Sequence, residues 1–251
     1  MTQMQYRASL FMLSMGQLLV TGIEFLVVLA LFYRFDSLLT WSLAEVALFY
    51  GFIHMVFAFS DAFSRGFDLM PLMIRTGELD RMMLRPVPVF MQLAGKELTL
   101  RRLGRLVQGM LVGIWAWNEL NISYSIETIG LFFWAASSAF LLFQAIVILQ
   151  ATLCFWTTES IELGNLFTYG GVEAVQFPIT IYPTSIQRFF LFVIPLAGVS
   201  YFPLVYLMGK ANFFGIPVWI AFLTPLAGWF FWAFSLLVFH LGMKHYASTG
   251  S

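Results

Sequence analysis

Charge is scarce in this chain. Only 10% of its 251 residues are Asp, Glu, Lys or Arg, whereas 60% are apolar. A soluble globular domain carries about 25% charged residues, and the mean hydropathy of +0.84 is far outside that class. The composition therefore excludes an ordinary soluble domain and indicates a protein whose main solvent is the lipid bilayer.

Three further absences restrict the chemistry that the chain can perform. A single cysteine, Cys154, allows no disulfide framework and no cysteine-based metal site. The three histidines and scattered carboxylates form no close ligand pair, so we expect no metal. The G-x-x-x-x-G-K-[ST] phosphate loop is missing, and no Ser–His or His/Asp cluster appears. We expect no catalytic residue, and an intramembrane enzyme is disfavoured.

Long apolar runs are what the sequence does contain. Because a helical span needs about 20 residues, a chain of this length predicts one membrane domain, 1–251, with five to seven spans. Five runs are evident, at residues 10–32, 43–63, 106–117, 128–156 and 217–241.

The stretch between residues 164 and 209 allows two interpretations. Residues 166–181 are apolar but include Glu173 and Gln176. Residues 189–208 are fully apolar but contain Pro195 and Pro203, each of which kinks or ends a helix. The second run is therefore either a kinked span or a re-entrant pair of half-helices surrounded by protein.

Basic residues predict the orientation. Eight of the thirteen Lys and Arg residues lie in one stretch, 64–105, which we call the Arg-rich loop. Short basic loops stay on the cytoplasmic side, and six spans then place both termini inside. Charge does not decide whether 166–181 crosses while 189–208 dips in from outside, or whether 189–208 crosses and 157–188 is cytoplasmic. The eight residues are Arg65, Arg75, Arg81, Arg85, Lys96, Arg101, Arg102 and Arg105.

Two segments resemble the type-2 family of ABC exporter permeases. The first is the stretch RTGELDRMMLRPVP at residues 75–88, with a lysine about ten residues on at Lys96. The second joins Phe177-Pro178 and Tyr182-Pro183 to Pro195-Leu196 and Tyr201, and looks like the family's outer segment. The resemblance covers essentially the whole chain and is greatest for small bacterial members without a fused ATPase.

The resemblance implies an all-α fold of six transmembrane helices, with a re-entrant helical segment at about 184–209 before the last span. It implies a bacterial inner-membrane permease that pairs with a second copy or a paralogue and docks on a separate cytoplasmic ATP-binding subunit. ATP and Mg²⁺ would be bound by that partner, so this chain needs no cofactor, and we expect no nucleic-acid partner. Docking would use a short coupling helix at residues 78–84, stopped by Pro86 and Pro88, with the contact residues Glu78, Leu79, Asp80, Arg81, Met82, Met83, Leu84 and Arg85. Without the resemblance, this segment reads equally well as an amphipathic helix on anionic headgroups.

Polar side chains inside the apolar runs are candidates for a translocation path, because burying them costs free energy unless they are paired. They also have a simpler explanation, since a mid-span histidine can merely bond across to another helix. The candidates are Glu24, His54, Gln144, Glu173 and Gln176.

Together these features predict the transmembrane subunit of an ATP-driven exporter that moves an amphipathic or apolar cargo by alternating access. A stand-alone secondary transporter or channel is the alternative. Such transporters usually show an internal repeat, and none is visible in the sequence.

Overall fold

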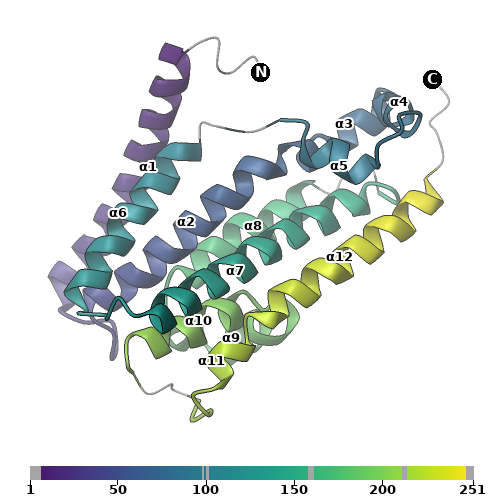
Figure 1. Cartoon of the computed structure of the whole chain (residues 1–251). Helices are drawn as coiled ribbons and strands as arrows, with labels where there is room; N and C mark the ends of the chain where they lie inside the picture. Colours follow the sequence, from purple (N-terminus) through teal and green to yellow (C-terminus); the bar gives the residue numbers. More distant parts are fainter. Residues whose placement is uncertain (1–6, 98, 100–101, 158–160, 211–213, 247–251) are drawn as a thin grey trace.

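The computed structural model describes residues 7–97, 99, 102–157, 161–210 and 214–246. Its regular elements are helices (Figure 1). Leu38 and Trp41 form an isolated antiparallel bridge in the turn after the first helix. The long helices are α1 (Arg7–Phe35), α2 (Leu43–Asp68), α6 (Leu103–Glu119), α7 (Ile126–Leu153), α8 (Ile161–Val175), α10 (Leu196–Leu207) and α12 (Leu226–His245). The all-α class that the resemblance implied is confirmed for the residues described.

Four helical stretches of the described residues are long and apolar enough to cross a membrane, or five if a bent pair counts as one span. The four are Phe11–Phe35, Leu43–Arg75, Ile126–Leu153 and Ile220–His245. Helices α6 and α8 have 17 and 15 residues, whereas a span needs about 20. Helix length alone therefore supports fewer spans than the six predicted.

The centre of the bundle is α2. It packs against α6, α7 and α8, and α7 packs in turn against α12. Of the 18 most apolar consecutive residues in Leu43–Arg75, 78% are buried inside the structure, whereas the corresponding share in Phe11–Phe35 is only 17%. Helix α1 lies at the periphery, against α6, and offers most of its apolar surface to the surroundings (Figure 1).

Glycines bring α2 and α6 into close contact. A Cβ placed on Gly51 would lie 2.5 Å from the backbone nitrogen of Gly113, and one on Gly109 would lie 2.7 Å from that of Met55. Small residues let two membrane helices approach until their backbones touch, which increases dispersion contacts in a solvent that offers no hydrophobic driving force. The α2–α6 pair is therefore one of the most closely packed contacts of the fold.

Three short helices of the Arg-rich loop lie at one end of the bundle (Figure 1): α3 (Met70–Arg75), α4 (Glu78–Met83) and α5 (Val89–Ala94). They form a second apolar core, separate from that of the bundle. In it Leu79, Met82 and Leu93 pack with residues of α2, with Ile148 of α7 and with Phe239 of α12. The loop is thus a folded cap packed on the ends of three long helices, α2, α7 and α12.

The opposite end holds α9 (Thr184–Arg188), a π-helical turn (Phe189–Val193), α10 and α11 (Ile220–Leu223). The chain bends by 99° between Thr184–Val193 and Leu196–Leu207. The break falls at Pro195, which has no N–H to continue a helix. This geometry belongs to a broken span or a re-entrant loop.

The predicted helix at 166–181 is displaced in the structure. Helix α8 ends at Val175, and a 3₁₀ turn at Ile179–Ile181 follows it. The cause is Pro178, because the residue before a proline is driven out of the α conformation. The predicted span reached residue 181 because the residues around Pro178 are apolar, and apolar composition alone does not show where a helix ends.

Candidate functional site

Helix α4 occupies the position predicted for the coupling helix. It begins after Gly77, whose φ of +65° lies in the left-handed region that favours glycine. It ends at Met83, and the backbone N–H of Arg85 donates to the carbonyl of Met82 at 3.2 Å. Pro86 then prevents the helix from continuing.

The apolar side chains of this segment divide into two groups. Leu79 is fully buried and Met82 is 5% exposed, and both lie in the cap's own core. Met83 and Leu84 are 46% and 86% exposed. Of the apolar residues predicted to enter a partner's groove, Leu79 and Met82 are therefore occupied inside the chain, and Met83 and Leu84 remain available.

The acidic residues of α4, Glu78 and Asp80, have partners within the chain. The Lys96 ammonium donates to Glu78 Oε1 at 2.8 Å, and this hydrogen bond holds the pKa of Glu78 below its usual range. Burial and the neighbouring Asp80 raise the pKa of Tyr246, just past α12, to about 12. Arg81 and Arg85 are exposed. The cap thus presents two arginines beside two large apolar side chains.

A polar cluster lies between the helices of the bundle. His54, on α2, is fully buried, and its Nε2 donates to Gln176 Oε1 at 2.9 Å. Gln176 Nε2 donates in turn to Glu173 Oε2 of α8 at 2.6 Å. Three of the five predicted path residues therefore form one hydrogen-bonded chain that links α2 to the end of α8.

Helices α1 and α6, with Tyr50 of α2, contribute the rest of this central polar cluster. Arg105 Nη2 lies 3.8 Å from Glu24 Oε1, and the guanidinium also sits 5.6 Å from the centre of the Phe57 ring. The Tyr50 ring stacks on His54 at 4.0 Å between centroids. Its hydroxyl donates to the backbone carbonyl of Thr21 at 3.0 Å and accepts from Gln108 Nε2 at 3.3 Å.

Gln144, the fifth candidate, lies outside the cluster. Its Nε2 donates to the carbonyl and hydroxyl oxygens of Ser60 at 2.7 and 3.2 Å, joining α7 to α2. It has the simpler role that sequence reasoning also allowed for polar residues in spans, a hydrogen bond between neighbouring helices.

Comparison with known protein families decides the class. A family model described as "ABC-2 family transporter protein" matches residues 18–250. The chain belongs to the ABC-2 transporter family. No curated protein and no solved structure matches it.

Family membership confirms the resemblance found in the sequence. ABC-2 permeases are non-catalytic membrane subunits of ABC transporters, and the family implies an ATP-binding partner in general terms. The chain is therefore a membrane transport protein with several apolar helices. The match assigns no role to an individual residue, so the roles of α4 and of the polar cluster depend on the geometry.

Sequence reasoning did not name Tyr50, Arg105 and Gln108 as candidates, although they lie in the central polar cluster. Arg105 was interpreted as part of the basic loop that sets orientation, yet it is 8% exposed. A signal was present, since Arg105 and Gln108 are three residues apart and so share one face of α6. A buried arginine on a helix face together with a glutamine predicts a carboxylate partner nearby, and here that partner is Glu24.

Proposed function

We propose that this ABC-2 permease is the transmembrane subunit of an exporter, and that it moves an amphipathic or apolar cargo by alternating access driven by a separate ATPase subunit. The observation that carries the proposal is the pair of exposed apolar side chains, Met83 and Leu84, on a helix whose other face is buried in the cap. Exposed methionine suits a contact that must persist while the partner moves.

The cap has a mechanical connection to the spans. Leu79 and Met82 pack in one core with Val147, Ile148 and Ala151 of α7 and with Phe239 of α12. A rigid-body displacement of α4 by the closing ATPase would therefore be carried to the ends of two long helices, because close-packed interiors transmit strain. ATP and Mg²⁺ would be bound by the partner, and this chain would supply only the docking surface for the ATPase and the translocation path.

The central polar cluster is our candidate for the point where the spans separate. It joins α1, α2, α6 and α8 through hydrogen bonds and one ion pair, in a region where each polar group must stay paired. Two arrangements with different pairings would give the two states that alternating access needs. Glu24, His54, Glu173 and Gln176 are the residues that we assign to this path.

For the topology we propose six spans with both termini in the cytoplasm of a bacterial cell. Helices α6 and α8 would cross as short spans, and residues 184–209 would enter from outside and return. The 99° bend at Pro195 and the exposure of Ser185 at the end away from the Arg-rich loop support this arrangement.

A single cysteine at Ser185, in a Cys154→Ala background, tests the topology. Labelling by an impermeant thiol reagent applied from outside is the expected result. Protection of this cysteine until the membrane is opened would instead place 157–188 in the cytoplasm and make 189–208 the crossing span.

Gentle purification of the tagged protein from its own membrane tests the function. We expect a polypeptide with a phosphate loop to copurify, together with a second permease copy or a paralogue. Recovery of the protein alone, under conditions that preserve other membrane complexes, would contradict the exporter proposal and favour a stand-alone transporter.

A further inference from the structure

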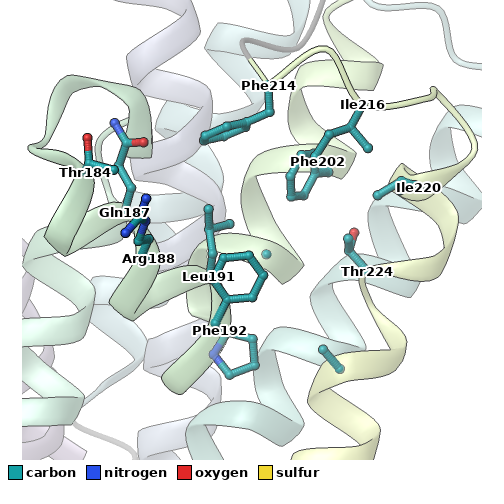
Figure 2. Close-up of a pocket in the computed structure, with 13 residues that line it drawn as sticks. Thr184, Gln187, Arg188, Leu191, Phe192, Phe202, Phe214, Ile216, Ile220 and Thr224 are labelled. Atoms are coloured by element: carbon teal, nitrogen blue, oxygen red, sulfur yellow. The ribbon is translucent and has the colours of Figure 1, made fainter.

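A cavity of about 460 Å³ lies at the end of the bundle opposite the Arg-rich loop. Its walls come from α9, the π-helical turn, α10 and the region of α11 and α12, so both arms of the bent segment and the start of the last long helix enclose it (Figure 2). Binding pockets for small ligands have volumes of about 300–1,000 Å³. This cavity falls in the lower half of that range.

One part of the cavity wall is apolar and largely aromatic. Phe202 of α10 and Phe214 pack with their ring centres 6.0 Å apart, and Ile216 and Ile220 continue the same wall. Leu191 and the 80%-exposed Phe192 extend from the π-helical turn on the other side. Such a surface favours a hydrocarbon chain, since burying it gains free energy in proportion to the apolar area covered.

Thr184, Gln187 and Arg188 of α9 lie together at one side of the cavity, and the remaining polar lining residue, Thr224, lies on the opposite wall (Figure 2). Gln187 Nε2 donates to the carbonyl of Tyr182 at 2.8 Å, which fixes this short helix to the turn before it. Arg188 is the one charged residue among those that line the cavity. It forms no ion pair with any residue that the structure describes.

The geometry points to a binding site for a single-chain amphiphile with an anionic head. The carboxylate or phosphate of the head would pair with the Arg188 guanidinium, which offers several donors in a fixed plane. The hydrocarbon chain would lie along Phe202, Phe214 and Ile220. The modest volume favours one chain over the two of a phospholipid. That this amphiphile is the transported cargo rests on the proposed function, whereas its binding in the cavity does not.

The test uses the full chain in nanodiscs of phosphatidylcholine, without ATPase or ATP. The probe is a long-chain fatty acid with a diazirine in its tail, and the comparison is its uncharged monoacylglycerol. We expect saturable labelling, cross-links within residues 184–227, and binding of the acid about tenfold tighter than that of the neutral probe, as one charge-assisted contact provides. Arg188→Gln should abolish the preference, and Arg188→Lys should keep most of it.

Two further variants control the interpretation. Arg34→Gln removes an exposed arginine of α1 that does not line the cavity, and should leave the preference unchanged. Ala227→Phe should fill the cavity and weaken both probes. An equal effect of Arg34→Gln and Arg188→Gln would overturn the site, because it would show only the general attraction of anions to a basic membrane surface.

Two other results would also contradict the proposal. Cross-links outside residues 184–227 would place the probe elsewhere, and displacement of the acid by a few per cent of phosphatidylglycerol would assign the cavity to a two-chain membrane lipid. Since no ATPase is present, failure here leaves the exporter proposal intact, and loss of the ATPase partner would leave this binding result intact.

Discussion

The two ends of the bundle differ in how their side chains are packed. At the Arg-rich end, three short helices form a closed core and present Met83 and Leu84 beside exposed arginines. At the other end, the chain folds back on itself at Pro195 and leaves an open apolar cavity with one arginine at its side. The first end exposes large apolar side chains over a packed core, as expected for a surface that binds a protein. The second end is hollow, as expected for a surface that admits a small molecule.

The two ends also differ in how they are fastened to the spans. The Arg-rich end is held by apolar packing on α7 and α12. The opposite end is also held by apolar packing, of α10 on α7 and α2, and it has in addition a polar contact, in which the Lys210 ammonium donates to Glu45 at 2.9 and 3.0 Å and to the carbonyl of Thr40 at 2.8 Å. The same ammonium lies 4.1 Å from the centre of the Trp41 ring. Packing transmits motion, whereas a polar clamp can open and close without loss of a core.

The largest effect is expected from the double change Met83→Asp and Leu84→Asp. Two carboxylates in an apolar contact would be left without partners, so we expect loss of ATPase binding while membrane insertion is unchanged. The measurement is copurification of the ATPase with the tagged permease. The matched control is Ile126→Asp, which changes a 94%-exposed residue at the other end of the bundle. Retained cargo-stimulated ATP hydrolysis in the double variant would sink the docking assignment.

Next in size is Arg105→Gln, in the centre between the two ends. Removing the guanidinium leaves Glu24 without its ion-pair partner, and we expect a loss of about 2–3 kcal/mol of stability, less than for a fully buried pair. Thermal unfolding in detergent measures this loss, and transport should fall with it. Arg34→Gln, at an exposed position, should cost almost nothing. Equal costs for the two changes would show that the cluster contributes no specific stability.

A smaller effect is expected at the ion pair between Lys210 and Glu45, at the end that holds the cavity. Glu45 also caps α2 by accepting from the Ser42 N–H at 2.8 Å, and glutamine can serve in this capping role. A cycle of Lys210→Met and Glu45→Gln therefore isolates the ion pair, with an expected coupling of about 1 kcal/mol. If the two changes had additive effects on the free energy of unfolding, the ion pair between Lys210 and Glu45 would contribute no stability.

The smallest effect is expected from Glu78→Gln in the cap. The pair with Lys96 is solvent-exposed and should contribute about 0.5 kcal/mol or less. Because the pKa of Glu78 is lowered in the folded state, this contribution is present above the unfolded pKa of about 4.3 and is lost as pH falls through the lower folded value. Stability of the wild type relative to the variant should thus be constant from pH 6 to 8 and converge only in acid. A difference that changes near neutral pH would contradict this assignment.

The sequence predicted the helices that contain the five evident apolar runs, because such runs are local signals. The expected stop of the coupling helix at Pro86 also agrees with α4, which ends at Met83. The inward orientation of Leu79 and Met82 was not predictable, since a helix of six residues shows no clear period and its buried face is decided by α7 and α12. Four apolar residues were therefore predicted to contact the partner, whereas only Met83 and Leu84 of these four are exposed.

The candidate path was predicted in part for a similar reason. Intramembrane polarity identified Glu24, His54, Glu173 and Gln176, which the structure brings into one region. It could not separate them from Gln144, because all five are polar residues in apolar runs. Arg105 was missed because an arginine near a basic loop carries the same sequence signal whether it faces water or a buried carboxylate.

One measurement tests the central claim most directly. A single cysteine at Leu84 and, separately, one at Ser185, both in a Cys154→Ala background, are treated with a short thiol-to-amine cross-linker in native membranes. The account predicts that Leu84→Cys forms an adduct with a polypeptide that contains a phosphate loop, and that Ser185→Cys forms none. An ATPase adduct at residue 185, or the absence of one at residue 84 in membranes where the ATPase copurifies, would contradict it.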